Sequence, residues 1–400
     1  MSVKYKIFID FDGTITCKDV GYELFRKFTD GATEPLVQRY RSGEVNSIEC
    51  LTGECEIWNS KRPAVQDVEE FLDTQSLAPG FAGFLSLLEE LELAPTILSE
   101  GFDFYIDRIL KKNDLGHIKR ITNKAAYTDV HLTPEFPFAG LGCGECSNCK
   151  GHHIRTLRPA DFSAVFIGDG HSDLHASVSA DILFAKSHLA EILTQKGEHF
   201  IPYGDFEDVV LRLRDIFRRQ IFTASRRIAF CRISERHYEA LQRLWEHGEV
   251  MRHEGHPSGL LRDADGYRRY FAQLPERADA IYLALEDQSG RFVGEAKIGF
   301  PNGSGECHHD LKLSPEFWGA GIDKESWKTV LKCSYSRWPD SVAVVTPGVE
   351  NERDIDMYLD LGFEFDGVLQ TRNRLESEMR ATAVEFRRMV KRDVAKTWLD

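Results

Sequence analysis

The chain begins with a short apolar run that ends abruptly in polar residues. Residues 7–9 are Ile-Phe-Ile, and the sequence Asp-Phe-Asp-Gly-Thr follows at 10–14. An uninterrupted apolar run of this length is typical of a strand buried on both faces of a parallel sheet. Open α/β sheets bind ligands beyond the carboxyl ends of their strands. The pattern therefore predicts a ligand site directly after residue 9, or, in the simpler alternative, a tight turn.

Helical periodicity dominates the segment that follows this strand. Four stretches carry it: residues 20–28, 34–41, 47–58 and 65–72. No strand pattern interrupts them, and together they are too long for a simple crossover between parallel strands. We expect a helical cap at approximately residues 17–77, inserted beside the site, where it would exclude water and select substrates.

Strand and helix patterns then alternate as far as residue 219. Apolar strand patterns occur at 95–98, 118–127, 164–167, 182–185 and 199–203, and helical patterns at 81–91, 103–112, 154–158 and 206–219. This alternation predicts an α/β domain with a parallel sheet. Residues 132–142 have the Pro and Gly content of a loop, and residues 212–227 carry no strong strand signal.

A second domain is expected after a boundary near residue 222, so that the two domains cover residues 1–222 and 223–400. Its strand patterns lie at 228–233, 281–286, 292–300, 309–313 and 342–346, and its helical patterns at 235–247, 267–273, 322–332 and 352–361. The two patterns at 281–300 indicate a hairpin.

Composition narrows the range of partners. The 400 residues carry a net charge of −14, with 42 % hydrophobic and 28 % charged residues. These shares are ordinary for a globular domain, and the acidic balance argues against a general nucleic-acid or anionic-membrane partner. We expect no signal peptide, no membrane span and a cytoplasmic location. The nine cysteines then indicate reduced thiols or metal ligands rather than disulfides.

Chemistry-bearing residues recur where the predicted strands end. Ser99 and Gly101 follow the strand at 95–98, and Asp169 follows the strand at 164–167 with Asp173 four residues later. A hydroxyl and a glycine amide before a helix can hold phosphate oxygens, although an ordinary helix cap has the same pattern. Carboxylates facing one pocket repel each other unless a cation lies between them, and hard oxygen ligands favour Mg²⁺.

A cysteine-rich loop precedes the helical pattern at 154–158. Cys143, Cys146 and Cys149 have C-x₂-C-x₂-C spacing, and His152 or His153 could provide a fourth ligand. Such a set is compatible with structural Zn²⁺, which would brace the loop, or with three reduced thiols.

The first half, residues 1–220, resembles the haloacid dehalogenase superfamily. The resemblance rests on the Asp-Phe-Asp-Gly-Thr sequence at 10–14, Ser99, a lysine, and the sequence Gly-Asp-Gly-His-Ser-Asp at 168–173, in the family's order. It implies a Rossmann-like core with a C1-type cap. The lysine is either Lys124 or Lys150. The cysteine loop is similar to the branch of phosphoserine phosphatase-like and methionine-salvage phosphatases, which favours Lys150.

The resemblance also implies roles for these residues. Asp10 would attack phosphorus and form an aspartyl-phosphate, and Asp12 would protonate the leaving alcohol and later activate water. Mg²⁺ would be held by Asp10, the main-chain carbonyl of Asp12 and Asp169, with Asp173 as a supporting acid. The phosphoryl oxygens would be bound by Ser99, the Gly101 amide and Lys150.

The second half, residues 227–400, resembles the GNAT N-acetyltransferases. The resemblance depends on the loop from Pro315 through Gly319, Gly321 and Ile322 into a helix, and on the later residues Asn351 and Tyr358 with Leu-Gly-Phe at 361–363. It implies an α+β fold, and loop amides that bind the pyrophosphate of acetyl-CoA. Two residues depart from the family pattern: Trp318, and Asp323, which would bring negative charge towards a pyrophosphate.

Three functions are consistent with these features. The first is Mg²⁺-dependent hydrolysis of a small phosphorylated metabolite, with an appended GNAT-like domain. The second is a bifunctional phosphatase and acetyl-CoA-dependent N-acetyltransferase. The third is a regulatory binding protein in which the GNAT-like half is not catalytic. The sequence predicts neither the particular phosphate ester nor the oligomeric state.

Overall fold

A computed structural model describes residues 2–128, 131–370 and 375–386. The chain forms two compact units, Tyr5–Asp215 and the remainder (Met1–Lys4 with Ile216–Asp400). We describe each unit by itself. Within the described residues, no helix has both the length and the apolar content that crossing a lipid bilayer requires.

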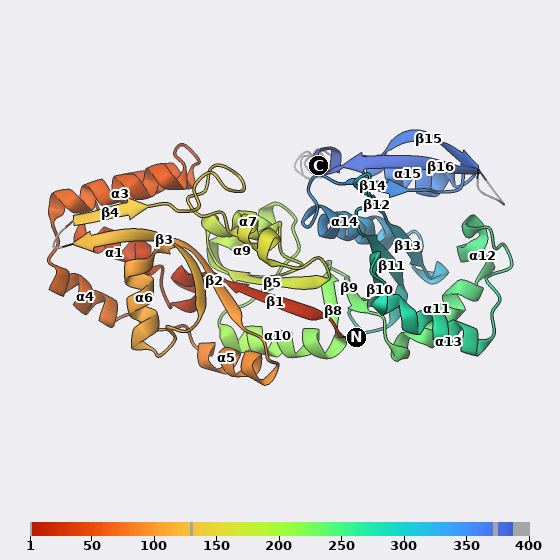
Figure 1. Cartoon of the computed structure of the whole chain (residues 1–400), viewed down its shortest axis with the longest axis horizontal. Coiled ribbons are helices and arrows are strands. Elements are labelled where there is room, and N and C mark those ends of the chain that lie inside the picture. Colours follow the sequence, from red (N-terminus) through yellow and green to blue (C-terminus); the bar gives the residue numbers. More distant parts are fainter. Residues whose placement is uncertain (1, 129–130, 371–374, 387–400) are drawn as a thin grey trace. The chain divides into compact units, whose positions relative to one another are not determined.

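The first unit is built on a seven-stranded sheet with β1 at its centre, in the order β4-β3-β2-β1-β5-β6-β7 (Figure 1). The strands are β1 (Lys4–Ile9), β2 (Pro95–Phe102), β3 (Lys119–Thr128), β4 (His131–Glu135), β5 (Phe162–Gly168), β6 (Ile182–Ala185) and β7 (Ile201–Pro202). The pairs β1–β2, β2–β3, β5–β6 and β6–β7 are parallel. The predicted parallel α/β class is therefore confirmed.

The central strands are buried as the apolar runs predict. Ile7, Phe8 and Ile9 are fully buried, and Phe8 packs with Leu98 and Phe166 from the flanking strands in one core cluster. The helices of this layer are α5 (Phe81–Glu90), α6 (Asp103–Lys112), α7 (Lys150–Leu157), α8 (Leu174–Ser177), α9 (Ser187–Gln195) and α10 (Phe206–Arg219). This packing fixes the carboxyl ends of β1, β2 and β5 at one edge of the sheet.

The helical insertion leaves and re-enters the core at one point. Thr16 and Leu77 form an isolated antiparallel bridge. Between them lie α1 (Val20–Phe28), α2 (Glu34–Arg41), α3 (Ser47–Lys61) and α4 (Val65–Asp73). Trp58 of α3 packs against α1, with its ring centroid 5.4 Å from that of Phe25 and 5.7 Å from that of Phe28.

The expectation of a loop at 132–142 is wrong for its first residues. Residues His131–Glu135 form β4, which pairs antiparallel with β3. Leu132 is fully buried, and its main-chain N–H and C=O both bond to the side chain of Asn59 on α3. The helical insertion thus stabilises an edge strand whose own sequence, which contains Pro134, is typical of a loop.

The second unit contains two sheets, with strand orders β13-β11-β10-β9-β8 and β12-β14-β16-β15. The strands are β8 (Ile221–Ala224), β9 (Ile228–Arg232), β10 (Ala280–Asp287), β11 (Phe292–Gly299), β12 (Glu306–His308), β13 (Asp310–Leu313), β14 (Val342–Val345), β15 (Glu364–Gln370) and β16 (Leu375–Thr382). The main helices are α11 (Glu235–Glu246), α12 (Gly248–Met251), α13 (Ala264–Gln273), α14 (Ile322–Tyr335) and α15 (Glu352–Asp360).

This arrangement confirms the α+β class and the β10–β11 hairpin. The absence of a strand signal at 212–227 was misleading, because β8 lies there and pairs with β9. The predicted domain boundary near residue 222 falls inside β8. Three further strands, β12, β15 and β16, were not predicted.

Candidate active site

Three buried charged side chains meet at the end of β1. Nζ of Lys150 lies 2.5 Å from Oδ1 of Asp10 and 2.6 Å from Oδ1 of Asp173, and it also donates to Oγ of Ser172 at 3.0 Å. Lys150 is 1 % exposed and Asp10 4 %. Asp10 directly follows β1 and Lys150 begins α7, so the sheet and a helix on it bring them together.

The turn after β1 requires glycine at position 13. Gly13 has φ +73°, and a Cβ atom there would lie 2.5 Å from Oδ2 of Asp169. Thr14 Oγ1 donates to Oδ1 of the same carboxylate at 2.9 Å. The turn therefore packs directly on Asp169, which explains why the acids of two different strand ends occupy one site.

Asp173 stabilises the loop that follows β5. Its Oδ2 accepts hydrogen bonds from the amides of Asp169, at 2.9 Å, and Gly170, at 3.0 Å, while its Oδ1 faces Lys150. A Cβ atom on Gly168 would collide with this carboxylate. Asp173 thus holds the loop after β5 and orients the lysine at the same time.

Asp12 faces a different set of partners. Its Oδ2 accepts a hydrogen bond from the Tyr105 hydroxyl at 2.7 Å, and its Oδ1 accepts from the Gly21 amide at 3.0 Å. Burial, together with the nearby carboxylate of Asp19, raises the pKa of Asp12 to about 7. A carboxyl group with this pKa can both donate and accept a proton near neutral pH.

The other residues predicted to bind phosphate also converge here. Ser99 is buried within β2, which continues past the predicted end at residue 98 to Phe102. Its Oγ lies 3.5 Å from Oδ2 of Asp12 and accepts a hydrogen bond from the Gly101 amide at 2.9 Å. Lys124, the alternative lysine, is exposed on β3. The geometry therefore brings Lys150, and not Lys124, into the site.

The donor set fits a hard divalent cation. Asp10, Asp169 and Asp173 each offer a carboxylate oxygen, and these oxygens lie within 4.8 Å of one another. Burial raises the pKa of Asp10 well above its usual range and the pKa of Asp169 to about 7. Burial lowers the pKa of Lys150, but Asp10 and Asp173 outweigh that effect and raise it. The single positive charge of Lys150 does not balance the negative charges of the three carboxylates, and oxygen ligands suit Mg²⁺.

A cavity of about 470 Å³ opens from these residues towards the helical insertion. Apolar side chains, including Phe25, Val37 and Leu51, form part of its wall. Two carboxyl groups also line it, those of the buried Glu54 and the half-buried Glu100. Burial raises the pKa of Glu54 to about 8 and that of Glu100 to about 7. Protonated carboxyl groups in such a wall can donate hydrogen bonds to neutral polar atoms of a ligand.

Tyr105, Glu54 and Glu100 are among the lining residues that were missed in the sequence. Tyr105 lies on the buried face of α6 and has the pattern of a core residue. Glu54 carried a usable signal, because it lies four residues from both Cys50 and Trp58 on the buried face of α3. A glutamate is rarely fully buried unless it is paired, so its place in an apolar helix face marks it for inspection.

The cysteine loop gathers a different fourth residue from the one expected. Cys143, Cys146, Cys149 and His175 place one ligand atom each within 4.8 Å of all the others. His152 is not part of this group, and His153 bonds through Nε2 to Oδ1 of Asn148 at 2.6 Å. The expectation of His152 is corrected to His175 because α8 packs against α7 at Gly151, where a Cβ atom would collide with the His175 carbonyl.

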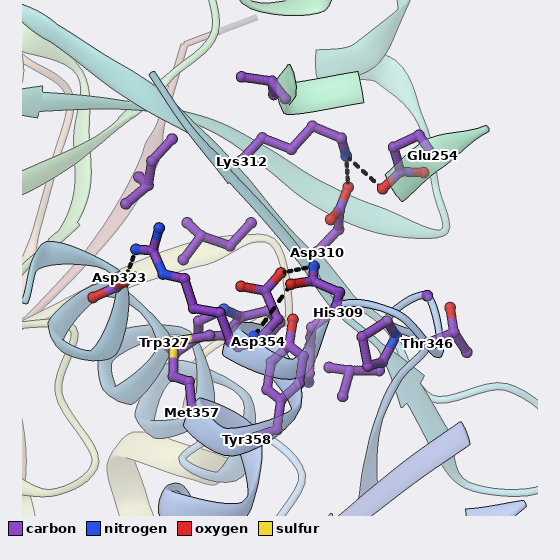
Figure 2. Close-up of a pocket in the computed structure, with 18 of the residues that line it drawn as sticks. Glu254, His309, Asp310, Lys312, Asp323, Trp327, Thr346, Asp354, Met357 and Tyr358 are labelled. Carbon is purple, nitrogen blue, oxygen red and sulfur yellow. Dashed lines mark hydrogen bonds and ion pairs between the residues drawn. The ribbon is translucent and has the colours of Figure 1, made fainter. Parts of the chain in front are cut away.

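The second unit contains a larger cavity of about 630 Å³ (Figure 2). Lys312 projects into it and pairs with Asp310 and with Glu254, the latter at 3.6 Å. Asn351 and Tyr358, both expected at an acetyl-CoA site, belong to its wall. The Tyr358 ring also packs against Trp327, with centroids 5.1 Å apart.

The glycine loop, residues 314–321, lies between β13 and α14. Gly319 and Gly321 have φ +76° and +69°, and Ile322 is the first residue of α14. The two departures from the family pattern are coupled in the structure. Arg353 pairs with Asp323 at 2.7 Å and lies 5.7 Å from the centroid of the Trp318 ring. The carboxylate that would disfavour an anion is thereby offset by a guanidinium.

Comparison with known proteins assigns the class of the first unit. Residues 7–177 match the family model of haloacid dehalogenase-like hydrolases. A 2-hydroxy-3-keto-5-methylthiopentenyl-1-phosphate phosphatase from Brevibacillus brevis is 31 % identical over 222 residues, which cover 54 % of this chain and 98 % of the relative. The chain therefore belongs to the haloacid dehalogenase-like hydrolase family, as the motifs predict, and it is an enzyme of the hydrolase class.

Other relatives and structures match parts of the chain. The bifunctional enzyme MtnB/MtnX of Bacillus licheniformis is 29 % identical over 207 residues, which cover 51 % of this chain and 48 % of that enzyme. The spermidine N-acetyltransferase of Vibrio cholerae, solved with CoA and spermine, covers 40 % of this chain and 97 % of its own, at 14 % identity and a TM-score of 0.36. A GNAT-family acetyltransferase from Bacillus anthracis has the same coverage of this chain, at 13 % identity and a TM-score of 0.36.

Proposed function

We propose that the first unit is a Mg²⁺-dependent phosphatase of a small phosphorylated metabolite and that it acts through an aspartyl-phosphate on Asp10. The observation that carries the proposal is the pair of buried ion pairs that Lys150 forms with Asp10 and Asp173. Asp12 lies two residues after Asp10 in the chain. A carboxylate nucleophile divides a difficult hydrolysis into two easier displacements.

Asp12 is the proposed general acid and base. It would protonate the leaving alcohol when Asp10 attacks, and then take a proton from the water that hydrolyses the acyl phosphate. Its pKa of about 7 suits both directions. The Tyr105 hydroxyl and the Gly21 amide hold its two oxygens, so the carboxyl group is oriented before a substrate binds.

The remaining site residues would neutralise the negative charge of the phosphoryl group. Lys150, the Ser99 hydroxyl and the Gly101 amide would bind the phosphoryl oxygens, where most of the stabilisation of phosphoryl transfer is needed. Asp10, Asp169 and Asp173, with the main-chain carbonyl of Asp12, would hold Mg²⁺, which when bound supplies further positive charge beside the transferred group.

The cavity supports a substrate with both polar and apolar parts. Curated relatives act on 2-hydroxy-3-keto-5-methylthiopentenyl-1-phosphate, which carries hydroxyl and keto oxygens beside a thioether tail. The carboxyl groups of Glu54 and Glu100 could bond such oxygens, and the apolar wall that includes Phe25 and Leu51 could contact the tail. We therefore propose this ester, or one of similar size and polarity, as the substrate.

A panel of phosphate esters assayed with Mg²⁺ tests the proposal. The full chain should release phosphate from small alkyl esters and prefer those with an apolar tail. Asp10→Asn should abolish release while circular dichroism stays unchanged. Release that is equally fast with the Asp10→Asn variant, or no release from any ester with Mg²⁺ present, would overturn the assignment.

A second candidate function is acetyl-CoA binding by the second unit. The observation that favours it is the Arg353–Asp323 pair beside the glycine loop, at a cavity lined by Asn351 and Tyr358. Titration calorimetry of the full chain with acetyl-CoA tests it. Binding with transfer to an amine would support a bifunctional enzyme, and binding without transfer a regulatory module. If there is no binding, acetyl-CoA is not the ligand.

A further inference from the structure

A second group of metal-ligand side chains lies outside the carboxylate site. Among the residues that the structure describes, Cys143, Cys146, Cys149 and His175 form this group, with all four ligand atoms within 4.8 Å of one another. The Cys146 sulfur lies 3.2 Å from Nδ1 of His175. All three cysteines are free thiols in the structure. The group is therefore a compact, reduced S₃N set.

The main chain around these sulfur atoms is shaped as in a built metal site. The amides of Glu145 and Cys146 both donate to the Cys143 sulfur, at 3.4 and 3.3 Å, and such bonds stabilise a thiolate. Gly142 has φ +72°, and a Cβ atom there would lie 2.9 Å from the Cys149 sulfur. These contacts close the loop over the cluster without any help from a disulfide.

The fourth ligand comes from a separate helix that is held close to the loop. Gly151 allows α7 to approach the His175 carbonyl, which any Cβ atom at position 151 would obstruct. The same carbonyl accepts a hydrogen bond from Oγ of Ser179 at 3.0 Å. The histidine backbone is thus fixed beside the cysteines by packing that does not depend on the cluster itself.

We propose that Cys143, Cys146, Cys149 and His175 bind one structural zinc ion. Three thiolates and one imidazole are soft and borderline donors that suit Zn²⁺ and not Mg²⁺. A tetrahedral site with Zn–S bonds of about 2.3 Å separates its sulfur atoms by roughly 3.8 Å, which agrees with the observed grouping. The four ligands fill the tetrahedron, so the site leaves no position for a substrate.

The position of the site gives the zinc a role in positioning the active site. Cys149 directly precedes Lys150, and His175 follows Asp173 by two residues. Zinc bound to both segments would tie together the helices that carry Lys150 and Asp173, whose side chains lie 2.6 Å apart. The metal would then act on the lysine through the main chain and would not contact the substrate.

Metal analysis of the full chain tests the assignment. Protein purified under a thiol reductant, reconstituted with zinc and desalted should retain about one zinc ion per chain by mass spectrometry. Cys146→Ser and His175→Ala should lose it. Two matched variants, His152→Ala in the same loop and Cys17→Ser at an exposed cysteine outside it, should retain it. A wild-type chain without zinc, or loss in His152→Ala with retention in His175→Ala, would overturn the proposal.

Cobalt substitution provides a readout that needs no variant. Co²⁺ in an S₃N site gives thiolate charge-transfer absorption and visible bands of tetrahedral type, whereas Co²⁺ bound to carboxylates gives neither. The wild-type chain should show both, and excess Mg²⁺ should not reduce them. A spectrum without thiolate bands would reject cysteine ligation. The experiment does not depend on phosphatase activity, so its failure would leave the proposed hydrolysis standing.

Discussion

The ammonium group of Lys150 lies 2.5 Å from Oδ1 of Asp10, although 140 residues separate the two in the chain. The lysine is held in place by its second carboxylate partner, Asp173, and by the Ser172 hydroxyl. Its positive charge is therefore fixed beside the proposed nucleophile before any substrate arrives. Fixed charges of this kind stabilise a transition state without reorganisation.

Lys150→Met should reduce phosphatase activity and stability together. Losing one fixed charge at a transition state typically costs about 10²–10³ in kcat, and unpairing buried carboxylates costs about 3–5 kcal/mol of unfolding free energy. Steady-state kinetics and denaturant unfolding measure the two effects. Lys124→Met on the exposed surface of β3 is the matched control and should change neither. Equal effects of the two variants would remove Lys150 from the site.

Asp12→Asn should slow turnover in a way that depends on the leaving group. Loss of a general acid typically costs about 10²–10⁴ in rate, but an aryl phosphate leaves without protonation. We expect a much smaller loss with an aryl phosphate than with an alkyl phosphate in single-turnover assays. A uniform loss across both substrates would contradict the acid role and leave Asp12 as a structural residue.

Gly13→Ala and Gly31→Ala separate backbone strain from damage to the site. Both glycines have positive φ, +73° and +75°, but an added Cβ atom would contact Asp169 only at Gly13 and would meet nothing at Gly31. Each alanine should cost about 1 kcal/mol of stability through its backbone conformation. Only Gly13→Ala should also abolish activity, because it displaces Asp169. An active Gly13→Ala variant would show that the position of Asp169 is not essential.

The raised pKa of Glu295 should make the stability of the second unit depend on pH. Burial raises the pKa of this carboxyl group from 4.5 to about 7, against the opposing effect of Lys312. The folded state then binds the proton more tightly than the unfolded state does. Its contribution, of the order of 3 kcal/mol, is complete below pH 4.5 and is lost as the pH rises through 7.

Glu295→Gln should remove this slope, because the amide keeps the shape and does not ionise. Hydrogen exchange of peptides from β11, measured between pH 5 and pH 8 and corrected for intrinsic rates, gives the local stability. The wild type should lose protection relative to the variant as the pH rises. A slope that persists in the variant would assign the pH dependence to other groups. Glu239→Gln on the exposed face of α11 is a matched control.

Much of this fold was predictable because local patterns agree with the tertiary structure. The helices α1, α2, α6 and α10 have the predicted bounds. In α1, α6 and α10 an apolar stripe faces the core. The positions of Asp10, Ser99 and Asp169 were found from apolar runs followed by polar residues. Here the local sequence and the buried environment require the same residues.

The strands and site residues that were not predicted have a common physical cause. Each depends on a partner that lies far away in the sequence or on another element. Strand β4 is stabilised by Asn59 of the helical insertion, and β8 by pairing with β9. Neither partner is visible in the local pattern. Tyr105 bonds to Asp12 across 93 residues, and His175 reaches the cysteine loop only because Gly151 permits close helix packing. Contacts of this kind have no periodicity that the sequence could reveal.

Trapping the phosphoryl group on Asp10 tests the proposed mechanism most directly. The full chain, quenched during turnover of a phosphate ester with Mg²⁺, can be reduced with borohydride, which converts an aspartyl-phosphate to homoserine. Peptide mass spectrometry should then locate homoserine at residue 10 in the wild type and in Asp12→Asn, and nowhere in Asp10→Asn. Modification at Asp12 in place of Asp10, or continued turnover by Asp10→Asn, would contradict the proposed mechanism.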